Sequence, residues 1–114
     1  MAFVAFMKFP GITPDQYDRL VLRLGLDEQP APGQILHIGA EFSEGFEACD
    51  VWMTREAAER YLDDRLRPAM LDAGIRTHPE MRLVPLHNAF VPELEMLARM
   101  GATSLPAVEA HILR

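Results

Sequence analysis

Residues 34–53, QILHIGAEFSEGFEACDVWM, predict a β-hairpin that carries a histidine, a cysteine, an aspartate and the single tryptophan of the chain. Two runs rich in apolar residues flank Ser43-Glu44-Gly45, which suits a turn. With a three-residue turn there, Phe42 lies opposite Phe46 and each later pair keeps the same register. A two-residue turn mixes polar and apolar residues on both faces, so the three-residue turn is favoured.

This register divides the reactive residues of the hairpin between the two faces of the sheet, because side chains alternate along a strand. Asp50 and Trp52 fall on the more apolar face, while His37 and Cys49 fall on the other. One subunit then cannot bring both pairs to one cavity. Either Asp50 and Trp52 line a cavity beneath the helices and His37 serves the other face, or the reverse.

A strand and a helix precede the hairpin. The segment Ala2–Phe9 is apolar on both faces, which indicates a central strand covered on both sides. Thr13 fits the N-cap of a helix, and Gln16 completes a capping box. Apolar residues then recur at helical spacing up to a glycine that can end the helix: Tyr17, Leu20, Val21, Leu24 and Gly25.

A second helix is predicted after the hairpin, from its N-cap Thr54 to Ala73. Pro68 falls inside the helical pattern and cannot donate a helical hydrogen bond, so we expect a kink or a break near Arg67.

The segment Met81–Asn88 predicts the last strand, and Pro85 indicates an edge position or a bulge in it. Two short helices are predicted beyond it, at 92–100 and 105–113.

The resulting order, β-α-β-β-α-β followed by a helical tail, is typical of a ferredoxin-like α+β sandwich with its helices on one face of the sheet. We assign residues 1–91 to this domain and residues 92–114 to a C-terminal helical extension. The other sheet face is left bare, although the first strand is apolar on both sides. A second copy of the chain is the most economical cover, so the sequence predicts a homodimer.

Composition narrows the class of protein. The 114 residues are 49% hydrophobic and 25% charged, with a formal net charge of -6 and no cluster of Lys or Arg, which argues against nucleic acid as a partner. One cysteine cannot form an internal disulfide, which suits a reducing compartment. The apolar start, MAFVAFMKFPG, lacks a basic segment and a cleavage site and is too short to span a bilayer. We therefore expect a cytoplasmic protein without a membrane partner.

Four blocks resemble a known family: PGITPDQYDRL, PGQILHI, DVWMTREAAERYLDDRLRPAM and VPLHNAF. Their spacing is similar to that of small dimeric α+β-barrel proteins related to antibiotic-biosynthesis monooxygenases, and closest to members of unknown function. The resemblance covers roughly residues 2–91. It implies two sheets packed face to face in a dimeric α+β barrel, with a cavity between each sheet and its helices. In the wider superfamily such folds host cofactor-independent oxygenation of polycyclic phenols, cyclisation or isomerisation of polyketide-like substrates, and haem binding or breakdown.

Two histidines on predicted strands are candidates for acid/base catalysis, because imidazole titrates near neutral pH. They are His37 and His87, and each could instead be a structural histidine held by a hydrogen bond. Asn88 points to the opposite face from His87 and is a candidate for orienting the substrate. With the second and fourth strands at opposite edges, the two histidines lie roughly 14 Å apart, too far to share a metal ion within one subunit.

Asp50 is the carboxylate of interest, since a charge on an apolar face must be paired or have its pKa raised. It is a candidate proton acceptor, or else half of a structural ion pair with Arg65 or Arg67. Trp52 offers a flat surface for an aromatic ligand, although a core position is the commoner role of tryptophan. Tyr61, on the buried stripe of the second helix, joins it as a substrate-binding candidate.

The sequence thus favours a small homodimeric enzyme that acts on a hydrophobic molecule, aromatic or of polyketide type, by cofactor-free acid/base chemistry like that of a monooxygenase or cyclase. Neither a phosphate-binding glycine loop nor a Rossmann fingerprint is present, which argues against nucleotide cofactors. The alternatives are a ligand-binding or stress-related dimer without catalysis, and a haem-binding protein.

Overall fold

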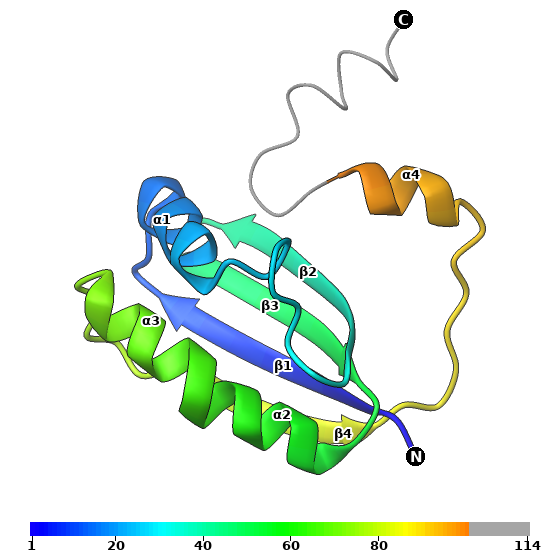
Figure 1. The fold of residues 1–114 in the computed structure, drawn as a ribbon. Helices are drawn as coiled ribbons and strands as arrows, with labels where there is room; N and C mark the ends of the chain where they lie inside the picture. Colours follow the sequence, from blue (N-terminus) through cyan, green and yellow to red (C-terminus); the bar gives the residue numbers. More distant parts are fainter. Residues whose placement is uncertain (101–114) are drawn as a thin grey trace, which may run out of the picture.

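The computed structural model describes residues 1–100, so the helix predicted at 105–113 lies outside the described residues. Within residues 1–100 a four-stranded antiparallel sheet runs in the order β2-β3-β1-β4, with β2 and β4 at its edges. The helices α1, α2 and α3 lie over one face of this sheet (Figure 1). This arrangement confirms the predicted ferredoxin-like α+β class. The strands are β1 (Phe3–Pro10), β2 (Gln34–Phe42), β3 (Gly45–Trp52) and β4 (Glu80–Pro85).

The first helix, α1 (Pro14–Leu24), begins at the predicted cap. The Thr13 hydroxyl accepts the Gln16 backbone N–H at 3.2 Å, and the Gln16 side-chain oxygen accepts the Thr13 backbone N–H at 3.0 Å. These two bonds satisfy backbone donors that the first turn of a helix leaves unpaired. Gly25 ends the helix in the left-handed conformation, with φ 60°. The helix buries its predicted apolar stripe against the sheet.

The second helical region is interrupted as Pro68 predicts. It consists of α2 (Arg55–Tyr61), a π-helical turn η1 (Leu62–Leu66) and α3 (Arg67–Asp72). Thr54 caps α2 by accepting the Ala57 N–H at 3.1 Å. Pro68 has no N–H, and the wider turn before it accommodates the missing hydrogen bond without ending the helical path.

The core lies between the sheet and these helices. On β1 it takes Ala5, Met7 and Phe9, and on β3 it takes Ala48 and Trp52. The opposite face of the sheet stays uncovered by any other part of residues 1–100, and Phe6 there is 39% exposed. The prediction that β1 is covered on both sides is therefore met only on the side that faces the helices; the other side is not covered by residues 1–100.

The last strand ends earlier than predicted, at Pro85 instead of Asn88. Pro85 pairs with Phe3 at the start of β1, and the Leu86 N–H makes one more bond, 2.9 Å long, to the Ala2 carbonyl. Because β1 begins at Phe3, the chain after Pro85 has no further residues of β1 to pair with. His87 and Asn88 consequently lie beyond the strand and are exposed.

A short helix, α4 (Leu94–Arg99), follows this segment, within the predicted range 92–100. No helix of residues 1–100 has the length and apolar character that crossing a membrane requires.

The predicted register of the hairpin is wrong by one residue. The turn holds two residues, Ser43 and Glu44, and Phe42 pairs with Gly45 instead of Phe46. The reason lies in β1: a Cβ at Gly45 would overlap the carbonyl oxygen of Phe9, and the Gly11 N–H donates to the Glu44 carbonyl at 2.7 Å. Gly45 is needed where two backbones approach closely, so it belongs to β3 and not to the turn. Because side chains alternate, the one-residue shift moves His37 to the other face.

We expect Gly45→Ala to lower the free energy of unfolding by about 2 kcal/mol or more, since the new methyl group meets backbone that cannot move freely. Gly74→Ala is the matched control: Gly74 also has a positive φ, of 74°, but nothing lies within 4 Å of its Cβ position. That variant should lose only the left-handed backbone penalty, about 1–2 kcal/mol. Urea unfolding measures both, and equal losses would contradict the close approach.

Candidate functional site

Three side chains from three elements form a hydrogen-bonded chain beneath the helices. The Asp50 carboxylate oxygen Oδ1 lies 2.6 Å from Nδ1 of His37, and Nε2 of the same ring lies 2.8 Å from the Tyr17 hydroxyl. Asp50 comes from β3, His37 from β2 and Tyr17 from α1. The sequence-based division that put Asp50 and His37 on opposite faces is therefore wrong, because in the actual register these two residues pair directly across the strands.

Asp50 is completely buried, and His37 is its partner. The predicted ion pair with Arg65 or Arg67 does not form. Arg65 instead donates to two backbone carbonyls, of Leu24 and Gln29, at 2.7 and 2.9 Å, and Arg67 pairs with Asp63 at 2.9 Å. A buried carboxylate without an adjacent cation depends on hydrogen bonds for its stability.

The two hydrogen bonds determine which tautomer a neutral His37 ring adopts. An ionised carboxylate only accepts hydrogen bonds, so Asp50 holds the proton of a neutral His37 ring on Nδ1. Nε2 is then an acceptor, and the Tyr17 O–H donates to it. The side chain of His37 is 27% exposed, while the carboxylate behind it is sealed from solvent. Asp50 thus orients a histidine that has its basic nitrogen directed at a phenol.

Tyr17 was expected only as part of the apolar stripe of α1, and its role is the main residue assignment that the sequence missed. Its ring stacks on Phe46 with centroids 4.3 Å apart and planes at 4°. A Cβ on Gly39 would overlap the Tyr17 hydroxyl, so the phenol can cross β2 only because that position lacks a side chain. A glycine inside a strand is the signal that could have revealed the contact.

Both tyrosines near Asp50 stay protonated at neutral pH. Burial raises the pKa of Tyr17 above its ordinary value, and the negative charges of Asp50 and Asp18 raise it further. Burial likewise raises the pKa of Tyr61, again with a contribution from Asp50. Tyr17 therefore acts as a neutral hydrogen-bond donor in the resting site.

The chain of hydrogen bonds ends at a cavity of about 380 Å³ between the sheet and the helices. The polar residues Tyr17, His37, Tyr61 and Gln34 are among those that line it, and α4 contributes Leu94, Leu97 and Ala98. The remaining lining is almost wholly apolar: Met7, Phe9, Leu20, Val21, Leu24, Leu26, Ile35, Leu36, Ala48 and Leu66, with Asp27 at one side. Its size and lining suit a hydrophobic small molecule.

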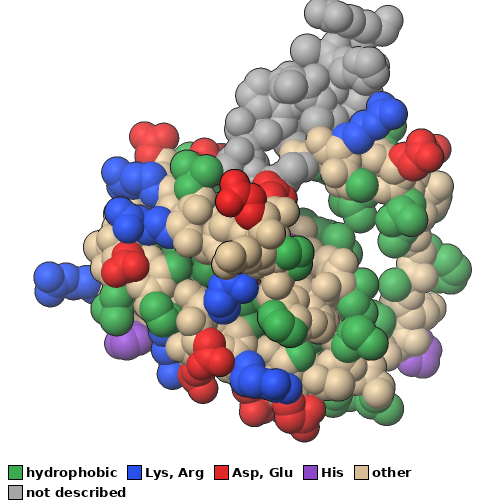
Figure 2. Space-filling model, in the orientation of Figure 1, with side chains coloured by type: hydrophobic (Ala, Val, Ile, Leu, Met, Phe, Trp, Pro, Cys, Tyr) green, Lys and Arg blue, Asp and Glu red, His purple; other side chains and the backbone are tan. Residues whose placement is uncertain are grey.

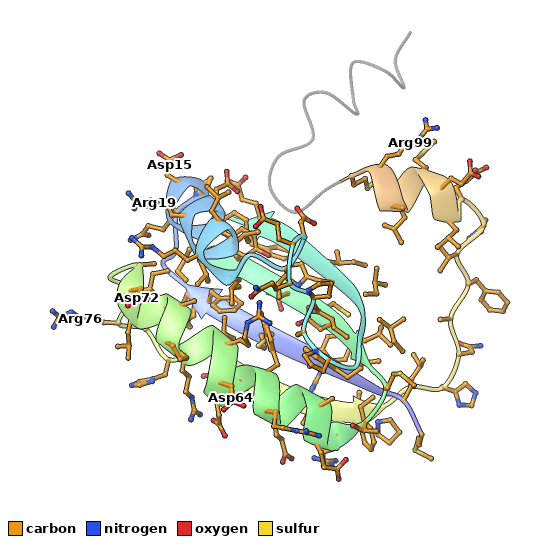
Figure 3. The ribbon with its side chains drawn as sticks, viewed as in Figure 1. Asp15, Arg19, Asp64, Asp72, Arg76 and Arg99 are labelled. Carbon is orange, nitrogen blue, oxygen red and sulfur yellow. The ribbon has the colours of Figure 1, made fainter. Side chains whose placement is uncertain are left out.

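Most charged side chains of residues 1–100 lie on the outer surface, with the buried Asp50 as an exception. Figure 3 shows Asp15, Arg19 and Arg76 pointing away from the body of the molecule. In Figure 2 positive and negative side chains are interspersed over the helix-covered face, and hydrophobic ones lie between the body and α4. Apart from Asp27 and His37, the residues that line the cavity carry no ionisable carboxylate, amine, guanidinium or imidazole, which favours an uncharged aromatic or aliphatic ligand.

The other predicted site residues fall into two groups. Tyr61 lines the cavity, and Trp52 is fully buried beside it, with ring centroids 4.9 Å apart, and is absent from the cavity wall. His87 and Asn88 lie past β4, at the opposite edge of the sheet from His37. The structure therefore brings His37, Asp50 and Tyr61 together and leaves His87 and Asn88 apart.

Metal-ligating side chains do not cluster in the described part of the chain. No group of three or more His, Cys, Asp and Glu residues within residues 1–100 has a geometry that could hold an ion. Cys49 lies on the uncovered face, paired across the strands with Phe6, and burial raises the pKa of its thiol.

Several solved structures share the fold of this chain. The chain is similar to a protein of unknown function from Nitrosomonas europaea, NE2512, with a TM-score of 0.61 and 18% identity over 80% of this chain and 94% of that one. It is similar to SnoaB, a cofactor-independent oxygenase from Streptomyces nogalater, with a TM-score of 0.55 and 18% identity over 81% and 96% of the two chains. It is also similar to the monooxygenase ActVA-Orf6 of Streptomyces coelicolor, solved with nanaomycin D. The TM-score is 0.54, with 19% identity over 81% of this chain and 93% of that one.

These likenesses confirm the fold of the single chain that the sequence resemblance implied, the α+β fold of antibiotic-biosynthesis monooxygenase-like proteins. At below 20% identity in these three comparisons they establish the fold and not the reaction. No protein-family model and no curated protein sequence matches the chain.

We expect Gly39→Ala to lower the free energy of unfolding by about 1–3 kcal/mol, because its methyl group displaces the Tyr17 hydroxyl. In a Tyr17→Phe background the same substitution should be milder by about 1 kcal/mol, since the overlapping oxygen is gone. Chemical denaturation of the four proteins of this cycle measures the coupling. Equal losses in both backgrounds would contradict the crossing of the phenol over Gly39.

Proposed function

We propose that the protein is a cofactor-independent enzyme that deprotonates a hydrophobic phenol or enol, in the manner of a monooxygenase or a cyclase. The observation that carries this proposal is the hydrogen-bonded chain from Asp50 through His37 to Tyr17, which ends in an otherwise apolar cavity. General base catalysis needs a basic nitrogen within hydrogen-bond reach of the proton that it removes, directly or through one intermediary.

The proton moves in two linked transfers. An acidic hydroxyl of the ligand donates to the Tyr17 oxygen, while the Tyr17 proton passes to Nε2 of His37 over 2.8 Å. The ligand becomes an anion, Tyr17 regains a proton, and His37 becomes an imidazolium. Asp50, at 2.6 Å from Nδ1, is placed to stabilise that positive charge. The raised pKa of Tyr17 suits an intermediary that passes a proton on without remaining a phenolate.

The ligand anion supplies the electrons for the next step. An electron-rich phenolate can reduce dioxygen directly; when a ring methylene becomes a carbonyl, one oxygen atom stays on carbon and the other leaves as water with the two hydrogens. Alternatively, an enolate can attack a carbonyl of its own chain and close a ring, with His37 returning the proton to the new alkoxide. The apolar cavity supports both by excluding bulk water from the anion.

Dithranol, a tricyclic dihydroxyanthrone, is a suitable probe, because its oxidation consumes dioxygen and changes its absorbance. We expect the protein to accelerate oxygen uptake above the rate in buffer. His37→Gln should lower the acceleration about a hundredfold or more, as loss of a general base commonly does. Asp50→Asn and Tyr17→Phe should also lower it, because each breaks one link of the chain.

His78→Gln is the matched control, since His78 is an exposed histidine on the loop before β4. His87→Gln tests the other histidine candidate, and we expect full activity because that residue lies at the opposite edge of the sheet. Unchanged acceleration by both His37→Gln and Tyr17→Phe would overturn the catalytic proposal. If these variants also retained affinity for the probe but unfolded more readily, the hydrogen-bonded chain would be a structural element of a binding protein.

The same proposal includes a homodimer formed through the uncovered sheet face. Two rows of side chains run across the strands there. One row consists of Val51, Val4 and Val84, and the other of Ile38, Cys49, Phe6 and Arg82. Phe6 on the central strand β1 is 39% exposed and Ile38 on the edge strand β2 is 45% exposed, so an apolar patch extends over the uncovered face. A second copy would bury both rows against each other.

Sedimentation velocity at micromolar concentration should give a dimer for the natural chain. Ile38→Lys should shift it to a monomer, because its charge would be buried in the interface. Leu22→Lys is the control, since Leu22 is 70% exposed on the outer side of α1. A monomeric natural chain would contradict the dimer.

A further inference from the structure

One part of the cavity wall comes from a helix that lies apart from the body of the protein. Leu94, Leu97 and Ala98 of α4 line the cavity. Leu97 and Ala98 follow Leu94 by three and four residues, so all three share one face of the helix. The other lining residues come from the sheet, from α1 and the loop that follows it, and from the second helical region. The helix α4 thus adds a separate apolar face to a wall that the body provides.

The segment between β4 and α4, residues 86–93, contains no helix or strand. Its first residue, Leu86, donates a backbone hydrogen bond to Ala2, and residues 87–92 make none to any other part of residues 1–100. Phe90 in this segment is 83% exposed. Figure 1 shows the segment arching away from the sheet, and Figure 2 shows an opening between it and the body. Few contacts therefore fix the position of α4, which is the condition for a segment to open and close locally.

The helix also has little apolar contact of its own. Five of its six residues are exposed, and Leu94 on its cavity face is 65% exposed. A helix of this length is too short to be stable in water without tertiary packing. An apolar ligand in the cavity would cover the leucines of this face, and the burial of leucine side chains is favourable. Ligand binding and the docking of α4 should therefore stabilise each other.

We propose that α4 is a lid, which docks through Leu94 and Leu97 over an uncharged aromatic ligand in the cavity and moves away to let the ligand enter and leave. The proposal rests on the hydrophobic ligand of the proposed function and not on the proton transfer. A docked lid removes water from around the ligand, as a site that holds a reactive anion requires. Its opening also sets the rate at which the ligand is released.

N-phenyl-α-naphthylamine is a suitable probe, because it is uncharged and aromatic and its fluorescence rises in apolar surroundings. We expect Leu97→Asp to raise the dissociation rate of the probe about tenfold or more in stopped-flow measurements, since closing the lid would then desolvate a charge. Met96→Asp is the matched control: it places the same charge on the same helix, but Met96 does not line the cavity. That variant should release the probe within about twofold of the natural rate.

Limited cleavage by trypsin separates a moving lid from a fixed wall. Arg99, in the last turn of α4, is exposed, and so is Arg76, on the loop before β4. We expect saturating probe to slow cleavage after Arg99 about fivefold or more and to leave cleavage after Arg76 unchanged, because docking protects the helix from local unfolding. In Leu97→Asp the protection at Arg99 should be lost.

Equal release rates in Leu97→Asp and the natural chain, a Met96→Asp variant that matches Leu97→Asp, or cleavage after Arg99 that does not depend on the probe would each overturn the proposal. So would a natural chain that does not bind the probe. These measurements need no turnover, so failure of the lid is distinct from failure of the catalytic proposal, which appears as unchanged dithranol oxidation in His37→Gln and Tyr17→Phe.

Discussion

The buried carboxylate of Asp50 is the constraint on which the site depends. It is 0% exposed and accepts a hydrogen bond from a ring 2.6 Å away, while its second oxygen has no partner in the described structure. A carboxylate in that position requires the His37 ring, and the ring can reach it only if β2 and β3 pair in the observed register. The register in turn requires a two-residue turn, which the close approach of Gly45 to β1 enforces. The backbone of one strand thus determines the chemistry on two others.

The same chain of requirements continues outward to α1. With His37 turned toward the helices, its Nε2 needs a partner, and the Tyr17 hydroxyl supplies it across the bare backbone of Gly39. The stacking of Tyr17 on Phe46 then fixes the height of the helix above the sheet. The geometry of the hydrogen-bonded chain and the packing of the core are therefore not separable in this protein: the contacts that close the core are the ones that direct Nε2 of His37 at the Tyr17 hydroxyl.

Much of the fold was predictable from the sequence, because caps, helical periodicity and the proline in the second helix are local signals. Thr13, Thr54 and Pro68 act as their positions predict. The site was not predictable to the same degree, because it depends on register, and a shift of one residue exchanges the two faces of a strand. The sequence of the turn is compatible with either two or three turn residues, so it did not decide the register. The contact that decides it joins Gly45 to Phe9, residues far apart in the chain. Tyr17 was missed because an aromatic residue on the apolar stripe of a helix is usually a core residue. Gln34 was missed because the alternation of apolar and polar residues does not reveal a β-bulge.

Two buried polar atoms without partners, Oδ2 of Asp50 and Nε2 of Gln34, lie on neighbouring strands of one small domain. Gln34 is one of the residues that line the cavity, whereas Asp50 is absent from the wall. Asp50 lies behind the His37 ring, which connects its carboxylate to the Tyr17 hydroxyl. In a low-dielectric interior an imidazolium and a carboxylate attract strongly, so in the proposed reaction the buried anion favours the transfer of a proton to His37. That transfer offsets part of the free energy that the burial of an ionised carboxylate costs in the resting protein.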